Sequence, residues 1–182
     1  MSPVSRLDVR PRLSEDLPAL ADVLMKVHAL DGYPVEGVAD PIGWLTPPRT
    51  FGAWTAVYGG RPIGQATITR ATADDDAARI WHENTGGDLD QLAIPARLFI
   101  DPDHRKNGAG GALLSAIRNH AENHGLEVAF DVMLKDRAAI RLYEASGCTR
   151  IGLIEHHHGD GKMEPAAVYV VDRPGPRGGR IQ

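Results

Sequence analysis

Glycines and basic residues gather in one short stretch near the middle of the chain, "HRKNGAGGALLSAI", which begins at His104. Arg105 and Lys106 precede two glycines, Gly108 and Gly110, and an apolar helical pattern follows them. A helix start carries unpaired backbone N–H groups and the positive end of the helix dipole, and both attract phosphate. Glycines let an anion approach that backbone closely, so the stretch predicts a site for a phosphate-bearing ligand.

Two common phosphate loops do not fit this stretch. A dinucleotide-binding loop has the spacing G-x-G-x-x-G near the start of the chain, with an acidic residue about twenty positions later. A nucleoside-triphosphate loop has Gly-Lys-Ser or Gly-Lys-Thr at its second glycine. The sequence meets neither requirement, so the ligand belongs to neither of these classes.

The other reactive residue types give weaker signals. Cys148 is the only cysteine, so no intramolecular disulfide forms and no cysteine cluster holds zinc. The stretch Glu155–Gly161 places three consecutive histidines beside two acidic residues. Successive side chains on a strand point to opposite faces, so these histidines do not converge and we predict no metal site.

Length and composition indicate one ordinary soluble domain. The chain has 182 residues, a formal net charge of -4 and a pI near 6.0, a balance that argues against nucleic acid as a partner. The first ten residues are charged early and lack an apolar segment, so we predict no signal peptide, no membrane span and a cytoplasmic location. We expect a single domain over residues 1–172 and a flexible tail over residues 173–182.

Hydrophobic periodicity and turn residues divide the chain into strands and helices. The predicted strands cover residues 6–11, two runs within 53–71 joined at Gly59 and Gly60, and residues 93–102, 126–134, 149–154 and 166–172. The predicted helices cover residues 14–30 with Ser14 or Asp16 as cap, 108–125 ended by Gly125, and 136–147 capped by Asp136, with a short turn at 42–45. Residues 72–91 are interpreted as an irregular connection and residues 155–161 as a histidine-rich loop. The result is an α+β (mixed α/β) fold, a mixed sheet with helices against its faces.

Two motifs in the C-terminal half resemble those of a known family. The pattern R-x-x-G-x-G at Arg105–Gly110 directly follows "LFIDP", and "AAIRLYEASG" comes about thirty residues later. Together they resemble the GCN5-related N-acetyltransferase (GNAT) superfamily, most strongly over residues 98–152. The resemblance implies the GNAT fold: a mostly antiparallel, twisted sheet of roughly six to seven strands, splayed between strands four and five and flanked by about four helices.

The resemblance also implies acetyl-CoA as cofactor and a set of residues that bind it. In the family, pantetheine lies along the fourth strand, which corresponds to backbone contacts from Leu98, Phe99 and Ile100. The Leu98 N–H matches the donor that bonds the thioester carbonyl, an oxyanion donor. The positions that match the pyrophosphate loop are Arg105, Lys106, Asn107, Gly108, Ala109, Gly110 and Gly111.

Tyr143 matches the tyrosine with which many family members protonate the departing coenzyme A thiolate, and a phenol with a pKa of about 10 suits that role. The alternative is a tyrosine that packs on the sheet or against the cofactor. Asp136 departs from the family pattern, because it stands where asparagine commonly contacts the cofactor; an ionised Asp136 caps a helix but repels phosphate. Cys148 replaces a common aromatic and is interpreted as a small buried residue.

The sequence offers several candidates for the base that takes a proton from the acceptor amine. Asp131, on the predicted strand 126–134, matches a position where ribosomal-protein N-terminal acetyltransferases carry a glutamate; a structural acid on a strand edge is the alternative. The remaining candidates for the acceptor site precede the fourth strand, follow the first helix or lie in the histidine-rich loop. They are His82, Glu83, His28, Asp31, Tyr33, His156 and His158.

The resemblance implies an acetyl-CoA-dependent N-acetyltransferase that works by direct attack of the amine in a ternary complex. The expected acceptor is a primary amine of a small molecule: an amino acid derivative, a polyamine or an aminated antibiotic. The alternatives are a peptide or protein acetyltransferase acting on N-termini or lysines, and a non-catalytic acyl-CoA-binding module. Family members are often dimers, so the expectation of a homodimer rests on analogy alone.

Overall fold

The computed structural model describes residues 6–158 and 161–173, which form one seven-stranded sheet flanked by helices. The strands are β1 (Leu7–Pro11), β2 (Thr50–Tyr58), β3 (Arg61–Arg70), β4 (Leu92–Ile100), β5 (Glu127–Met133), β6 (Cys148–His158) and β7 (Lys162–Val171). The α-helices are α1 (Leu17–Asp31), α2 (Pro41–Leu45), α3 (Asp76–Thr85), α4 (Ala109–Asn123) and α5 (Arg137–Ala145). Short 3₁₀ turns are η1 (Ser14–Asp16), η2 (Leu89–Gln91) and η3 (Pro102–His104). The strand order is β1-β2-β3-β4-β5-β7-β6, and neighbours are antiparallel except for the parallel pair β4–β5.

Local sequence signals set several of these boundaries. Gly59 and Gly60 adopt φ values of 56° and 82°, the left-handed values that a two-residue hairpin turn requires, and they join β2 to β3. Asp136 Oδ1 accepts a hydrogen bond from Ala139 N at 3.1 Å and so caps α5. Gly125 adopts φ 68° just beyond α4. The predictions for this hairpin and for these two helix ends are confirmed.

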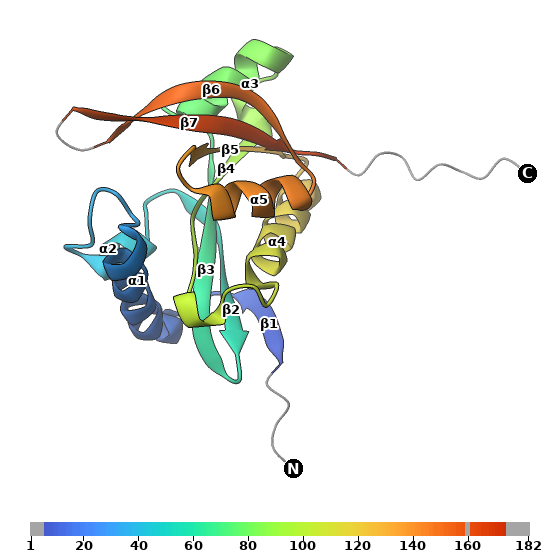
Figure 1. The fold of residues 1–182 in the computed structure, drawn as a ribbon. Helices are drawn as coiled ribbons and strands as arrows, with labels where there is room; N and C mark the ends of the chain where they lie inside the picture. Colours follow the sequence, from blue (N-terminus) through green and yellow to red (C-terminus); the bar gives the residue numbers. More distant parts are fainter. Residues whose placement is uncertain (1–5, 159–160, 174–182) are drawn as a thin grey trace, which may run out of the picture.

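The helices cover both faces of the sheet (Figure 1). On one face, α4 buries Leu113 and Ile117 in the main core, and α5 lies beside α4. On the opposite face, α1 and α2 place Leu24 and Leu45 around Phe99 of β4. α3 packs at the end of the sheet formed by β5, β7 and β6. The central strand β4 therefore sends its side chains alternately toward α4 and toward α1.

The helix α3 corrects the prediction of an irregular connection over residues 72–91. Its Ala77, Ala78 and Trp81 are buried against β5, β6 and β7. The indole Nε1 of Trp81 donates a hydrogen bond to Glu127 Oε2 of β5 at 3.0 Å. The aspartates at positions 74–76 obscured this pattern, because a run of like charges is typical of a solvated loop.

β6 continues through much of the predicted histidine-rich loop. The strand extends beyond Ile154 because it stays paired with β7 as far as His158, which opposes Lys162. Residues 159–160 of that loop lie outside the described residues. Of the predicted tail over residues 173–182, Arg173 is described and its guanidinium lies 3.0 Å from Glu127 Oε1, whereas residues 174–182 lie outside the description.

A buried carboxylate joins β1 to α1 and β2. Asp16 precedes α1 as predicted, but its side chain makes no cap bond and turns to β1 and β2 instead. It accepts hydrogen bonds from Arg10 Nη1 and Nη2 at 2.8 Å each, from Leu13 N at 2.8 Å and from Thr55 Oγ1 at 2.9 Å. The residue is 2% exposed, and the bonds from Arg10 lower the pKa of Asp16 to about 2.

We predict that Asp16→Asn lowers the free energy of unfolding by about 2 kcal/mol near neutral pH, because the buried hydrogen bonds lose their anion. The pKa of Asp16 is about 2 when folded and 3.8 in its unperturbed state. The contribution of ionised Asp16 to the free energy of unfolding is therefore present above about pH 4 and is lost as the pH falls toward 2. Urea unfolding at several pH values measures this, with the exposed Asp8→Asn on β1 as control. Equal losses in the two variants would contradict the account.

Candidate active site

The sheet opens between its two parallel strands, β4 and β5. Within the described residues these strands pair near their starts, at Leu92–Glu127 and Ala93–Val128, and then separate. Residues 95–98 are only half-buried, although β4 is the central strand and its residues on either side of this stretch are buried. The opening exposes one edge of β4 inside the sheet, which confirms the predicted splay.

Two features of β4 prevent further pairing with β5. The carbonyl of Leu92 accepts a hydrogen bond at 3.1 Å from Ala71 N, just beyond β3, so the polar backbone groups of Leu92 face β3. These groups alternate between the two sides of a strand, so those of Pro95, three residues later, face β5. Proline has no N–H to donate there. Farther along, Arg97 and Leu98 together oppose the single residue Ala66 of β3, which is a β-bulge, and Arg97 adopts φ 57°.

Beyond the bulge, β4 directs two N–H groups into the opening. Asp101 N donates to Ile63 O at 2.6 Å, so the polar backbone groups of Asp101 and Phe99 face β3. Those of Leu98 and Ile100 consequently face away from β3, toward the opening. The side chains alternate as well, because Leu98 packs on the α4 side and Phe99 on the α1 side.

The loop from β4 to α4 gathers backbone N–H groups at the start of the helix. Lys106 and Gly108 adopt φ values of 62° and 88°, which turn the chain into α4. Asn107 Oδ1 accepts a hydrogen bond from Ala109 N at 3.1 Å. The N–H groups of Gly110 and Gly111 lie in the first turn, where helical geometry provides no acceptor. The loop therefore has the geometry of an anion site at a helix start.

The glycines of this loop serve different purposes. Gly108 requires its positive φ, and Gly110 lies so close to α5 that a Cβ would come within 2.8 Å of Leu142 Cδ2. Gly111 is helical and has open space around it, so no neighbouring atom of the described residues excludes a side chain there. It borders a cavity of about 350 Å³ between α4 and α5, whose other lining residues are Leu114, Ser115, Arg118, Ala145 and Ser146. An open backbone beside a cavity permits close approach of a ligand.

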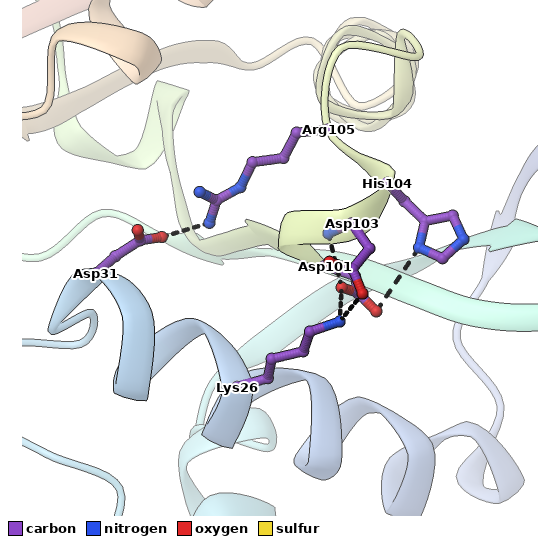
Figure 2. A network of polar contacts seen from close by, with 6 residues as sticks. All are labelled: Lys26, Asp31, Asp101, Asp103, His104 and Arg105. Atoms are coloured by element: carbon purple, nitrogen blue, oxygen red, sulfur yellow. Dashed lines mark hydrogen bonds and ion pairs between the residues drawn. The ribbon is translucent and has the colours of Figure 1, made fainter.

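Two basic residues hold α1 against this loop, as Figure 2 shows. Arg105 donates a hydrogen bond to Asp31 at the end of α1. Lys26 Nζ lies 2.6 Å from Asp101 Oδ1 and 2.5 Å from Asp103 Oδ2. The structure thus brings together Arg105, predicted for the cofactor, and Asp31, predicted for the acceptor. Their contact ties the end of α1 to the loop before α4.

Tyr143 of α5 lies in the layer that covers the other face. Its ring meets that of Phe130 on β5 edge to face, with 4.5 Å between the centroids. Burial raises the pKa of Tyr143, and the charges of Asp136 and Asp131 contribute to the increase. Tyr143 is therefore protonated at neutral pH.

The segment between α1 and β2 forms an aromatic wall, which we define as Tyr33, Trp44 and Phe99. The rings of Tyr33 and Trp44 meet edge to face at 5.7 Å, and Trp44 lies 6.0 Å from Phe99 of β4. The guanidinium carbon of Arg97 lies 4.8 Å from the centroid of the Trp44 ring. Glu36 Oε1 accepts a hydrogen bond from Trp44 Nε1 at 3.0 Å. The wall therefore carries one cation and one anion.

Sequence reasoning missed Trp44, Arg97 and Glu36. Trp44 and Glu36 come from the proline-broken segment that follows α1, whose course no local pattern determines. The short helical turn predicted within it is confirmed as α2, which carries Trp44. Arg97 gave a usable signal, because it is a lone charge inside the apolar strand "LAIPARLFI".

Asp131 and His156 form a pair, although they come from β5 and β6. His156 Nδ1 lies 3.0 Å from Asp131 Oδ2, and their side chains are 33% and 25% exposed. The hydrogen bond to Asp131 raises the pKa of His156, and the charges of Asp76 and Glu36 raise it further. An ionised carboxylate only accepts hydrogen bonds, so neutral His156 keeps its proton on Nδ1 and its lone pair on Nε2. Two candidates predicted separately are therefore partners.

The remaining predicted candidates lie on α1, α3 and β6. His82 and Glu83 are exposed on α3, where His82 Nδ1 lies 2.7 Å from a carbonyl just beyond the helix and Glu83 contacts Arg79 at 3.1 Å. His28 lies on α1, and its Nδ1 is buried with no hydrogen-bond partner among the described residues. The backbone of His158 ends β6, and its side chain lies outside the description.

Cys148 has the properties of an unreactive, structural thiol. Cys148 is buried, as predicted, and burial raises the pKa of its thiol to about 11, which keeps the thiol protonated at neutral pH.

Within residues 6–158 and 161–173, no group of three or more histidine, cysteine or acidic side chains is placed to hold a metal ion. No helix among the described residues has both the length and the apolar character needed to cross a membrane.

The model of the acetyltransferase (GNAT) family matches residues 17–148, and no curated protein sequence matches the chain. Arabidopsis thaliana NAA60 in complex with acetyl-CoA is similar in structure, with a TM-score of 0.70 and 18% identity over 91% of this chain and 97% of that chain. The ribosomal-protein-S18-alanine N-acetyltransferase from Escherichia coli has a TM-score of 0.65 and 18% identity, over 94% and 98% of the two chains. A putative phosphinothricin N-acetyltransferase has a TM-score of 0.64 and 18% identity, over 91% and 97%. At these identities the likeness to solved structures shows the fold alone.

We predict that the pKa of His156 lies above the ordinary histidine value of 6.5, because ionised Asp131 stabilises the protonated ring. An NMR titration of the ring C–H signals measures this pKa in the wild type and in Asp131→Asn, in which it falls. Asp22→Asn, which removes an exposed acid from α1, serves as the control and leaves the titration unchanged. A His156 pKa that is indifferent to Asp131→Asn would show that the pair does not form in solution.

Proposed function

Because the chain belongs to the acetyltransferase (GNAT) family, we propose that it is an acetyl-CoA-dependent N-acetyltransferase whose acceptor is a primary amine of a small molecule. The observation that carries this proposal is the opening between β4 and β5. An anion site lies at the start of α4, and Tyr143 and the Asp131–His156 pair come from β5, β6 and α5. A small acceptor is supported by the aromatic wall, where Arg97 and Glu36 present opposite charges on the α1 side.

The described residues fit acetyl-CoA. We assign its diphosphate to the backbone of residues 105–111, where N–H groups of the first helical turn have no acceptor within the helix. We assign its pantetheine to the free edge of β4 at Leu98, Phe99 and Ile100, and the cavity beside Gly111 gives the ligand room to continue. When bound, acetyl-CoA supplies an activated acetyl group, whose transfer to an amine breaks a C–S bond and forms a C–N bond.

Leu98 N–H serves in this proposal as the oxyanion donor. Its direction is set by the β-bulge, in which Leu98 shares the opposing residue Ala66 with Arg97 and turns its polar groups to the opening. A donor held in place by the sheet needs no reorganisation when negative charge develops on a carbonyl oxygen, and such preorganised donors contribute strongly to catalysis.

Tyr143 serves as the acid that protonates the departing sulfur. Its raised pKa keeps the hydroxyl protonated across the neutral range, so the proton is available when a thiolate forms. Asp136 stands at the start of the same helix, where it caps α5 and contributes to this raised pKa. The packing of the ring on Phe130 fixes its orientation.

The Asp131–His156 pair serves as the base. Asp131 holds Nδ1 of the imidazole, so the lone pair of the neutral ring lies on Nε2, which takes the proton that the acceptor ammonium must lose. The raised pKa of His156 makes it a stronger base than an isolated histidine. In this arrangement Asp131 acts through His156, as a positioning residue.

Thiol release from acetyl-CoA, measured with a panel of amines, tests the proposed function. The panel contains free amino acids, polyamines, an aminoglycoside and short peptides with free N-termini. We expect turnover with at least one small amine. Turnover of peptides alone would show instead that the protein is a protein or peptide acetyltransferase. Coenzyme A binding by calorimetry without turnover of any amine would identify a non-catalytic acyl-CoA-binding module.

We predict that Tyr143→Phe lowers kcat about 100-fold, because the departing sulfur loses its proton donor while the ring still packs on Phe130. Calorimetry should show nearly unchanged affinity for coenzyme A. Tyr58→Phe, which removes a hydroxyl from β2, is the matched control and keeps the wild-type rate. If rapid-quench measurements find the chemical step equally fast in Tyr143→Phe and the wild type, Tyr143 has a packing role only.

A further inference from the structure

Arg97 has an unusual backbone conformation at the centre of the sheet. It is one of two residues of β4 that oppose the single residue Ala66, and its φ of 57° lies in the left-handed region that β-strand residues rarely adopt. Such a conformation costs free energy and persists where the surrounding structure holds it in place, often at functional sites. Arg97 is also the residue immediately before Leu98, whose N–H faces the opening.

The guanidinium of Arg97 is fixed on the α1 side of the opening. It stacks on Trp44 at 4.8 Å and donates a hydrogen bond from Nη1 to Trp44 O. A guanidinium has five N–H donors in a planar fork, and among the described residues this one donates that single hydrogen bond. The side chain is only half-buried, so its remaining donors are within reach of a ligand. The geometry leaves a preorganised fork that suits a carboxylate.

Among the described residues, Glu36 is the acid that acts electrostatically on Arg97, and it also acts on His156 and on Tyr33. Glu36 is tied to Trp44 Nε1 by one oxygen and makes no ion pair with Arg97 within the described residues. One cation and one anion therefore stand separately on the same aromatic wall. This pattern matches a molecule that carries an ammonium and a carboxylate close together.

We propose that Arg97 binds the carboxylate of the acceptor, so that the acceptors are free α-amino acids whose amine lies next to that carboxylate. This inference rests on the proposed function and narrows its acceptor class. The arginine fork holds the carboxylate on the α1 side, and the adjacent amine is thereby presented to the edge of β4 at Leu98. A peptide N-terminus lacks the carboxylate beside its amine, because that group has become an amide. Simple polyamines lack it altogether.

Matched pairs of acceptors test this proposal: several free L-amino acids and their α-amides, which share side chain and amine and differ in the carboxylate. With the wild type we expect kcat/KM for a free amino acid to exceed that for its amide by about 100-fold, as a charge-assisted bidentate contact implies. In Arg97→Gln this advantage disappears, because kcat/KM for the free amino acid falls while kcat/KM for its amide changes little. Arg97→Lys retains part of it, because a point charge replaces the fork.

Arg70→Gln is the matched control, since Arg70 also stacks on an aromatic ring, that of Phe51 at 5.1 Å, but it lies at the end of β3 opposite Ala93, where β4 is still paired with β5. We expect Arg70→Gln to keep the wild-type ratio of kcat/KM between a free amino acid and its amide. Calorimetry with the same free amino acids in the presence of coenzyme A gives a readout without turnover, and binding weakens in Arg97→Gln alone.

The outcomes separate this inference from the function on which it rests. A wild type that acetylates amides as fast as free amino acids overturns the carboxylate site and leaves the N-acetyltransferase in place. Equal losses for both acceptors in Arg97→Gln, with folding intact by circular dichroism, would assign Arg97 a structural role and overturn the proposal. Absence of turnover with every amine overturns the proposed function itself.

Discussion

The inability of β4 to pair with β5 beyond Ala93 is the constraint on which this structure depends. Pro95 removes the donor that the next hydrogen bond would need, and the bulge at Arg97 and Leu98 changes the direction of the strand. A parallel pair at the centre of a sheet is ordinarily buried and continuous. Here, within the described residues, the separation leaves the N–H groups of Leu98 and Ile100 facing the opening instead of a neighbouring strand. Under the proposed function, an extended ligand takes the place of that strand.

The remaining parts of the site are arranged on the two sides of this opening. On one side, α4 and α5 provide the anion site and Tyr143, and the cavity beside Gly111 lies between them. On the other side, the aromatic wall carries Arg97 and Glu36. The ion pair of Arg105 and Asp31 joins the loop before α4 to the end of α1 and so connects the two sides (Figure 2). Under the proposed function, one side holds the cofactor and the other selects the acceptor.

The sequence predicted those parts whose signals are local. Two adjacent glycines specified the hairpin of β2 and β3, and the cap at Asp136 specified α5, because each depends on residues a few positions apart. The predictions failed where charge obscured an apolar pattern, as in α3, and where tertiary packing decides the course of the chain, as with Trp44. The pair of Asp131 and His156 joins β5 to β6 across the intervening β7, and no spacing in the sequence indicates such a contact. The resemblance supplied the candidates for the cofactor site, whereas Trp44, Arg97 and Glu36 came from the structure.

A crystal structure of the protein with bound coenzyme A tests the central claim most directly. The account predicts diphosphate oxygens within hydrogen-bond distance of the N–H groups of Gly110 and Gly111, and pantetheine amides bonded to the free edge of β4 at Leu98 or Ile100. Coenzyme A bound elsewhere, or β4 and β5 fully paired with no ligand between them, would contradict it.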